Sequence, residues 1–301
     1  MTNTFTVVGL GELIWDLLPT GKQLGGAPTN FAYVSHLLGA AAFVASRVGA
    51  DELGREASAR LTRLGLDASH LQHDATHPTG TVGVTLDAHG EPHFQMNEDS
   101  AWDYLEWTDE WAELAARTDA VCFGTLGQRA AQARAVIRQF LRHTRADALR
   151  LFDVNLRHSF FTPDMLAASL RQATVCKLNS DELARVAAML ALSAHGELDI
   201  ARQLLRIFDL QLVAVTRGAR GSLLVTRDDM VAHAGLRVQV ADTIGAGDAF
   251  AATLAHGLLR RAPLARLSAA ANRMGAWLAT QTGATPPADA QVRAEMRGLL
   301  D

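Results

Sequence analysis

A glycine-containing segment near the C-terminal end of the chain combines groups that suit the transfer of a phosphoryl group. Residues 242–250 have the sequence DTIGAGDAF and lead into an alanine-rich stretch whose apolar residues recur at the four-residue spacing of a helix face. The two glycines, at positions 245 and 247, let the backbone approach a ligand closely. We therefore expect the amides of Gly245, Ala246 and Gly247, at the N-terminus of the helix, to form an anion hole.

Asp248 lies in the first turn of the same expected helix, so the segment places a carboxylate beside the anion hole. Such a carboxylate can accept the proton of an attacking hydroxyl. The helix N-terminus should favour its ionised form, which makes it a ready acceptor at neutral pH but a weak base. A glycine-containing turn with an aspartate that caps the helix explains the four residues GAGD equally well.

The elements that must position this segment follow an alternating βα pattern. Short β-branched or apolar runs are followed by stretches with helical spacing, such as residues 131–143 and 181–190. This alternation predicts an α/β fold with a mainly parallel central sheet covered by helices. The expected strands are residues 6–10, 43–48, 120–123, 149–154, 175–178, 212–216 and 222–226.

One region interrupts the alternation. Polar and apolar residues alternate over residues 81–86, residues 87–90 form an expected turn, and residues 92–96 extend again, which predicts a hairpin. Residues 12–24 are also extended. We expect both pieces to form a small sheet that projects from the main body, with an ordinary surface hairpin as the alternative.

Composition argues against several classes of protein. With 301 residues, 49% hydrophobic content and no linker-like or repeated segment, the chain is expected to form a single globular domain. A formal charge of -4 leaves no basic surplus for binding nucleic acid. Cys122 and Cys176 are too few and too far apart for a disulfide framework. Because neither a signal peptide nor a run of about 20 apolar residues occurs, we expect a cytoplasmic protein without a membrane partner.

Two common nucleotide-binding motifs are absent from the sequence. Gly9 and Gly11 follow a strand-like run, but Ile14 occupies the position of the third glycine of a dinucleotide-binding motif. Lys22 follows Gly21 without the spacing of a P-loop. The phosphates of a nucleotide would therefore need another site, and residues 242–250 offer one.

Several segments resemble the PfkB or ribokinase-like family of carbohydrate kinases, in the order of that family and along nearly the whole chain. DTIGAGDAF is similar to the C-terminal signature of the family, and GGAPTNFA (residues 25–32) resembles the N-terminal glycine signature of its fructokinase-like members. Other similar segments are GELIWD (11–16), SRVGADELG (46–54), DVNLR (153–157), KLNSDEL (177–183), VTRGARGS (215–222) and TGATP (282–286).

The resemblance implies a three-layer α/β/α ribokinase-like domain spanning residues 1–301, with a β-sheet lid formed by about residues 12–24 and 80–103. It implies that Asp248 is the catalytic base, that ATP binds at one end of the sheet and that the sugar binds beneath the lid. The implied sugar-binding positions are Asp16, Gly25, Gly26, Asn30, Asn155 and Arg157. Without the resemblance, Asp16 would be interpreted as a lone loop carboxylate, Asn30 as a polar residue at a helix start, and Asn155 and Arg157 equally as a buried structural pair.

For the nucleotide, the resemblance implies contacts from Thr216, Gly218, Gly221 and Asn272. It also implies that Asn179 and Glu182 hold Mg²⁺ through water, between the phosphates of ATP. The same two residues, three apart where a helix starts, fit a capping box equally well. Asp242 and the backbone of Ile244 would contribute to a site for a monovalent cation such as K⁺.

We therefore predict an ATP-dependent kinase of a free sugar, with fructose as the first choice because GELIWD and GGAPTNFA are fructokinase-like. Ribose, 2-keto-3-deoxygluconate or a nucleoside is the alternative acceptor, since a few lid side chains can set specificity. A sugar- or nucleotide-binding regulator without turnover is an alternative from another class. An exposed lid sheet would favour a homodimer that covers its edge.

Overall fold

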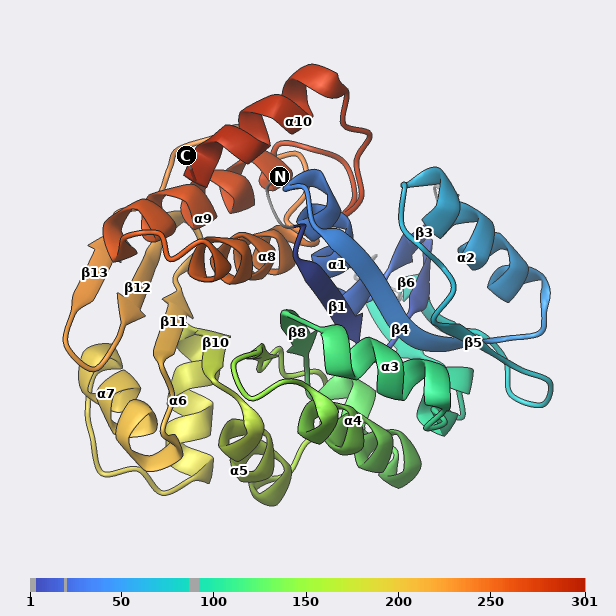
Figure 1. The fold of residues 1–301 in the computed structure, drawn as a ribbon, viewed down its shortest axis with the longest axis horizontal. Coiled ribbons are helices and arrows are strands. Elements are labelled where there is room, and N and C mark those ends of the chain that lie inside the picture. Colours follow the sequence, from blue (N-terminus) through green and yellow to red (C-terminus); the bar gives the residue numbers. More distant parts are fainter. Residues whose placement is uncertain (1–3, 19–20, 87–91, 301) are drawn as a thin grey trace.

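A nine-stranded sheet forms the centre of the molecule, here described for residues 4–18, 21–86 and 92–300 of a computed structural model (Figure 1). The strands from β11 to β5 are parallel, and the last two strands at the other edge are antiparallel. The spatial order is β13 (Met230–His233), β12 (Ser222–Val225), β11 (Leu212–Thr216), β10 (Val175–Asn179), β9 (Leu149–Asp153), β8 (Ala120–Phe123), β1 (Thr6–Leu10), β4 (Ala41–Gly49) and β5 (Leu71–Asp74). The mainly parallel sheet is confirmed, and each strand expected from the sequence lies within two residues of its predicted bounds.

Helices cover both faces of this sheet and give it three layers (Figure 1). One layer holds α1 (Ala27–Leu37), α2 (Glu52–Arg63), α8 (Ala246–Leu259), α9 (Leu264–Ala279) and α10 (Ala290–Arg297). The other holds α3 (Asp109–Arg117), α4 (Ala131–His143), α5 (Pro163–Gln172), α6 (Ser180–Met189) and α7 (Glu197–Phe208). Successive strand residues feed opposite cores, as Val7 and Val8 do, because neighbouring side chains of a strand point to opposite faces.

A second, four-stranded sheet stands at one end of the central sheet, beside α2 (Figure 1). Its order is β3 (Gly21–Gly25), β2 (Ile14–Leu18), β6 (Gly80–Leu86) and β7 (Pro92–Met96). Strands β6 and β7 pair antiparallel, which confirms the predicted hairpin, although its turn at 87–90 lies outside the described residues. Ile14 and Val82 pack with Trp102 and Leu126 in a small apolar cluster at the base of this sheet.

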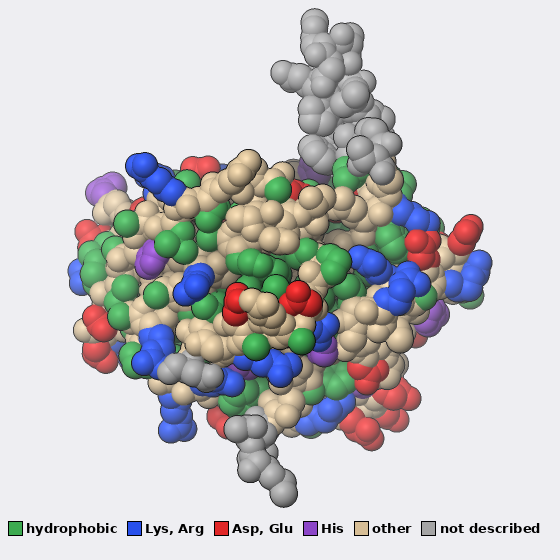
Figure 2. Space-filling model, turned by 90° about the horizontal axis from the view of Figure 1, so that it is seen from above, with side chains coloured by type: hydrophobic (Ala, Val, Ile, Leu, Met, Phe, Trp, Pro, Cys, Tyr) green, Lys and Arg blue, Asp and Glu red, His purple; other side chains and the backbone are tan. Residues whose placement is uncertain are grey.

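Four short 3₁₀ helices complete the described structure: η1 (Ala101–Tyr104), η2 (Leu126–Gln128), η3 (Gly218–Arg220) and η4 (Gly298–Leu300). None of the helices in the described ranges is long and apolar enough to cross a bilayer. On the face shown in Figure 2, Lys and Arg side chains are interspersed with Asp and Glu side chains. The carboxyl ends of β1, β9, β10 and β11 meet at one edge of the central sheet, which is where open parallel sheets usually bind ligands.

Candidate active site

The start of α8 is a tight bend that depends on glycine. Gly245 adopts the left-handed φ of 79° at the N-cap, and a Cβ atom there would lie 2.6 Å from the Cβ of Ala284. The first helical hydrogen bond runs from the Ala249 amide to the Gly245 carbonyl, at 2.8 Å. The chain therefore enters the helix abruptly, with the amides of its first turn pointing away from the helix body.

The expected anion hole is smaller than the sequence suggested. The Ala246 amide donates to the Thr243 carbonyl at 3.3 Å and so partly closes the bend. In the described part of the chain, the amides of Gly245 and Gly247 have no hydrogen-bond acceptor. Two of the three predicted amides thus remain available for an anion at the helix N-terminus.

A buried lysine lies directly beneath this hole. Lys177 Nζ would be 2.9 Å from a Cβ atom placed on Gly247, so a side chain at this position would require the ammonium group to move. The same nitrogen lies 3.0 and 2.9 Å from the two carboxylate oxygens of Asp153. Burial alone would lower the pKa of Lys177, but the nearby carboxylates of Asp153, Asp248 and Glu182 outweigh it and raise that pKa. Lys177 is therefore a cation at neutral pH, and it lies below the first turn of α8.

Asp248 projects from the first turn of α8 and is held by a residue of α1. Asn30 Nδ2 donates a hydrogen bond to Asp248 Oδ2 at 2.8 Å. Burial raises the pKa of Asp248, although Lys177, the Asn30 hydrogen bond and Arg157 each oppose the rise. From the helix N-terminus alone, the sequence predicted that the ionised form of Asp248 is favoured. The structure instead gives Asp248 a raised pKa, because the side chain is buried, which the sequence did not reveal. A raised pKa makes the carboxylate a stronger base.

The predicted sugar-binding residues gather around this carboxylate. Asp16 of β2 faces Gly25 of β3 so closely that a Cβ atom on Gly25 would lie 2.8 Å from Asp16 Oδ2. Gly26, with a φ of 98°, turns the chain from β3 into α1 and brings Asn30 toward Asp248. The charge of Arg157 lowers the pKa values of both Asp16 and Asp248, so it lies within electrostatic reach of both carboxyl groups. Burial nevertheless raises the pKa of Asp16 overall.

Asn155 and Arg157 follow the carboxyl end of β9. Asn155 has a positive φ of 37°, and its carbonyl accepts a hydrogen bond from Thr125 Oγ1 at 3.2 Å. Arg157 is exposed. The alternative of a buried structural pair therefore does not describe Arg157.

The expected nucleotide contacts lie farther along the same edge. Thr216 ends β11 directly beside Asn179, the last residue of β10. Gly218 and Gly221 have φ values of 58° and 84° and shape the turn from β11 into β12. A Cβ atom on Gly221 would lie 2.0 Å from the His233 carbonyl oxygen, so this turn also requires glycine.

Asn179 and Glu182 form the capping box that the sequence left open as an alternative. Asn179 Oδ1 accepts from the Glu182 amide and Glu182 Oε2 accepts from the Asn179 amide, both at 2.8 Å. Glu182 Oε1 also accepts from the Leu156 amide at 2.9 Å, which ties α6 to the segment after β9. Each oxygen keeps a lone pair for water, so the arrangement can hold a hydrated cation in an outer shell. The described residues contain no group of three His, Cys, Asp or Glu side chains that could enclose a metal.

Asn272 and Asp242 make contacts that stabilise the fold. Asn272 Nδ2 donates to Ser222 Oγ and to the Ser268 carbonyl, both at 2.7 Å, and so joins α9 to β12. Asp242 accepts from the Ile244 amide at 2.9 Å and from the Gly283 amide at 3.2 Å. The contacts of Asn272 occupy the amide nitrogen that would otherwise be available to donate to a nucleotide base. The contact of Asp242 with Gly283 links the bend before α8 to residues 282–287.

Three charged residues at the site received no role from the sequence: Glu12, Asp153 and Lys177. Glu12 follows β1, is 3% exposed, and its Oε2 has no hydrogen-bond partner among the described residues. Burial raises the pKa of Glu12 to about 7, and the charge of Asp248 adds to the rise. The available signal was a charged residue inside or just after an apolar strand, as with Lys177 in VCKLN.

A family model described as pfkB family carbohydrate kinase matches residues 12–291 of this chain. The chain belongs to the pfkB family of carbohydrate kinases. It is therefore a phosphotransferase that acts on a sugar hydroxyl.

Individual relatives agree with this assignment. A fructokinase of Escherichia coli is 32% identical over 91% of this chain and 93% of its own. An aminoimidazole riboside kinase of Salmonella typhimurium is 30% identical over 91% of this chain and 89% of its own. Among solved structures, a fructokinase from Vibrio cholerae in its fructose-, ADP- and calcium-bound form has a TM-score of 0.78 and 25% identity, covering 99% of each chain.

Proposed function

We propose that this pfkB-family enzyme transfers the γ-phosphoryl group of ATP to a hydroxyl of fructose, with Asp248 as the base. The observation that carries the proposal is one shared location: the Asp248 carboxylate, the Gly245 and Gly247 amides and the Lys177 ammonium meet at the N-terminus of α8. Fructose is the favoured acceptor because the Escherichia coli and Vibrio cholerae relatives are fructokinases and the latter was solved with fructose bound.

Asp248 removes one proton during the transfer. The sugar hydroxyl gives its proton to the carboxylate as its oxygen attacks the γ-phosphorus, and the bond from that phosphorus to the β-γ bridging oxygen breaks, leaving its electron pair on ADP. The raised pKa of Asp248 strengthens the base, and the Asn30 hydrogen bond fixes the rotamer of the carboxylate. Asn30 thereby leaves Asp248 Oδ1 free for the hydroxyl.

Negative charge on the transferred phosphoryl group meets fixed positive charge. The Gly245 and Gly247 amides donate to its oxygens, and Lys177 supplies a full charge beneath them. Asp153 holds the lysine in place with both carboxylate oxygens, so little reorganisation is needed during transfer. These contacts support transition-state stabilisation by groups that are already oriented.

Sugar recognition would rest on polar groups from four segments. Asp16 and Asn30 offer hydroxyl partners, the Gly25–Gly26 backbone allows close approach, and Asn155 and Arg157 border the phosphoryl side. Residues 1–301 would act as one catalytic domain in which segments 12–24 and 80–103 form the lid over the sugar. A homodimer through the lid sheet and a cytoplasmic location complete the proposal.

ATP would lie along the carboxyl ends of β10 and β11, with contacts from Thr216, Gly218 and Gly221. The exposed side chains of Leu236 and Val238 offer an apolar surface for the adenine ring of ATP. They lie near the Gly218–Gly221 turn, because Gly221 of that turn packs against Gly235. The amide nitrogen of Asn272 already donates within the fold, so this residue would support the adenine site without donating a hydrogen bond to adenine.

Metal ions would assist without a protein cage. Asn179 and Glu182 fit an outer-shell role toward Mg²⁺, since their oxygens keep lone pairs for its water ligands. When bound with ATP, Mg²⁺ would neutralise phosphate charge. Asp242 and the Ile244 backbone remain the candidates for a monovalent cation such as K⁺ beside the bend.

A coupled ADP-release assay with Mg²⁺ tests the proposal, run with fructose, ribose, 2-keto-3-deoxygluconate and a nucleoside, each with and without K⁺. We expect fructose to give the highest kcat/KM. Preference for the nucleoside would favour the activity of the aminoimidazole riboside kinase relative. Ligand binding without ADP release from any acceptor would support the non-catalytic regulator instead.

Asp248→Asn tests the base itself. The amide keeps the shape and the Asn30 contact but cannot accept the proton, so we expect kcat to fall about 10²-fold or more with fructose affinity preserved. Thermal unfolding of the variant serves as the control for folding. Turnover comparable with that of the unmodified enzyme would refute the assignment.

A further inference from the structure

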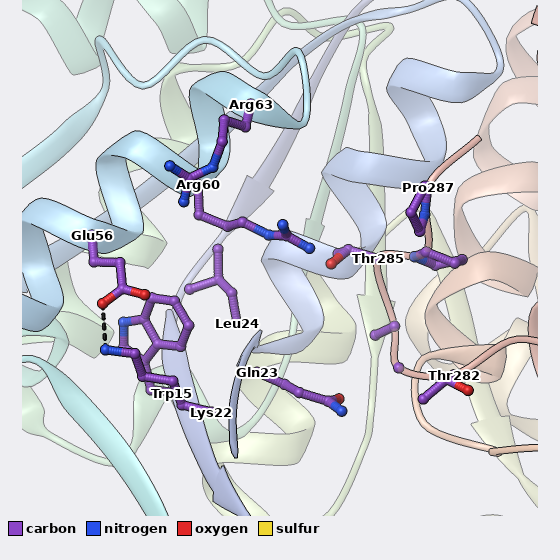
Figure 3. Close-up of a pocket in the computed structure, with 13 residues that line it drawn as sticks. Trp15, Lys22, Gln23, Leu24, Glu56, Arg60, Arg63, Thr282, Thr285 and Pro287 are labelled. Carbon is purple, nitrogen blue, oxygen red and sulfur yellow. Dashed lines mark hydrogen bonds and ion pairs between the residues drawn. The ribbon is translucent and has the colours of Figure 1, made fainter. Parts of the chain in front are cut away.

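A cavity of about 290 Å³ lies between the small sheet, α2 and the segment 282–287 (Figure 3). Its volume is close to the lower end of the ~300–1,000 Å³ typical of small-molecule sites. Trp15, Leu24 and Pro286 supply apolar surface, and Thr282 and Thr285 supply hydroxyl groups. No residue proposed above to contact sugar or nucleotide lines this cavity.

Most of the small-sheet side chains that line the cavity point away from the sugar-binding face. Trp15 pairs with Leu24 and Asp16 pairs with Gln23 in the β2–β3 ladder. Because successive residues of a strand point to opposite faces, Trp15 and Leu24 face away from the side on which Asp16 lies. Trp15 Nε1 donates to the Leu53 carbonyl at 3.0 Å, which holds β2 against α2. Gln23, which lies on the Asp16 side of the ladder, also lines the cavity, so the cavity adjoins the catalytic site without sharing a residue proposed to bind sugar or nucleotide.

Two arginines give the cavity an uncompensated positive charge. Arg60 extends from α2 toward Thr285, and Arg63 lies one turn farther along the same helix (Figure 3). In the ranges that the structure describes, neither guanidinium has a hydrogen-bond or ion-pair partner. Glu56, four residues before Arg60, would be its natural partner on the helix but pairs with Lys22 of β3 instead. The two guanidinium groups are thus available to a ligand.

We propose that this cavity is a second binding site, for a small metabolite that carries a phosphoryl group. The planar guanidinium fork matches phosphoryl oxygens, and an anion would relieve the repulsion between two like charges on adjacent turns. The threonine hydroxyls would complete the oxygen contacts, and the apolar wall formed by Trp15, Leu24 and Pro286 would pack against the carbon skeleton.

Binding at this site would affect the catalytic bend, which is the segment 242–247 that leads into α8. The segment 282–287 forms one wall, and its Gly283 amide donates to Asp242, the residue that opens the DTIGAGDAF segment. Tyr33 of α1 donates its hydroxyl proton to the Pro286 carbonyl, which ties the same wall to the helix that carries Asn30. By linkage, a metabolite that changes sugar affinity must have its own affinity changed by the sugar by the same factor.

Calorimetric titration with glucose 6-phosphate, inorganic phosphate and citrate tests the proposal on the full chain. The titration is done with and without saturating fructose and a non-hydrolysable ATP analogue, which would fill the catalytic site. The test variant is Arg60→Gln with Arg63→Gln, and the matched control is Arg55→Gln, on the same helix but outside the cavity lining. Glucose 6-phosphate should bind the saturated enzyme, and the double substitution should weaken it about tenfold or more, because charge-assisted contacts are lost.

Equal binding by the double variant, or no binding to the saturated enzyme, would overturn the site. Binding of citrate without either phosphate compound would overturn the phosphoryl class. Equal affinity with and without fructose would overturn the coupling to the catalytic bend. If fructose and the ATP analogue fail to bind, the proposed function fails, while the arginine-dependent titration of the free protein still decides the second site.

Discussion

Two buried ion pairs of this molecule, Arg129–Asp103 and Lys177–Asp153, have different roles. Arg129 contacts Asp103 with two bonds of 2.8 and 2.6 Å at the base of the small sheet, and Lys177 contacts Asp153 with two bonds of 3.0 and 2.9 Å beneath the catalytic bend. All four side chains are at most 8% exposed. The pairs are therefore matched in burial and geometry, and only their surroundings differ.

The surroundings decide what each pair does. Arg129 also donates to the Asn97 carbonyl at 3.0 Å and stacks 4.0 Å from the centre of the Trp102 ring, so its contacts belong to the fold. Lys177 lies beneath Gly247, and the charge of Asp248 acts on it. A buried ion pair gains little net stability by itself, but it is costly to break when one charge remains. We therefore expect the first pair to govern stability and the second to govern turnover.

Arg129→Leu should give the larger effect on stability. The change leaves Asp103 buried without its cation and removes the stacking on Trp102, so the free energy of unfolding should fall by about 3–5 kcal/mol. Urea unfolding measures this loss, and Arg227→Leu is the control because Arg227 and its partner Asp209 are 62% and 87% exposed. That control should change by less than about 1 kcal/mol. A similar small change for Arg129→Leu would remove the contrast between the pairs.

Lys177→Met should act mainly on catalysis. Burial raises the pKa of Asp153, so without the lysine this carboxyl takes up a proton and the fold persists. Loss of the cation under the phosphoryl group should lower kcat about 10²-fold with little change in the KM for fructose. The chain has one other lysine, and Lys22→Met on the exposed pair with Glu56 is the matched control. If Lys177→Met kept full kcat but lost stability, the two pairs would be equivalent.

The fold followed from periodicity because buried strands and amphipathic helices have distinct patterns. Residues 120–123 and 212–216 were predicted with the bounds that the structure shows, and helix 131–143 likewise. Strands β5 and β13 escaped prediction, since QHD and the exposed MVAH run lack a continuous apolar pattern. An edge strand needs one partner only, so its sequence is weakly constrained.

The site was predictable only in part, because sequence motifs specify local geometry and not enclosure. The glycine bend before Asp248 was visible in DTIGAGDAF. The burial that raises the pKa of Asp248 comes from segments far apart in the chain, such as the one carrying Asn30, 218 residues away. The pairing of Lys177 with Asp153 likewise depends on the parallel register of β9 and β10. The spacing of residues along the chain does not reveal contacts between segments that are far apart in sequence.

Glu12 extends the comparison to a buried charge without an ion-pair partner, and pH tests it. Its folded pKa of about 7 lies above the ordinary glutamate value of 4.5, so the folded state holds this proton more tightly than the unfolded state does. The stabilising contribution is full below pH 4.5, falls as pH rises toward 7, and is lost above it; the change amounts to about 2–3 kcal/mol. Glu12→Gln cannot ionise, so we expect the free energy of unfolding of the variant, relative to the unmodified protein, to rise by that amount between pH 5 and pH 8. A difference independent of pH, measured by urea unfolding at both values, would mean that Glu12 does not titrate differently in the folded and unfolded states and would contradict the raised pKa.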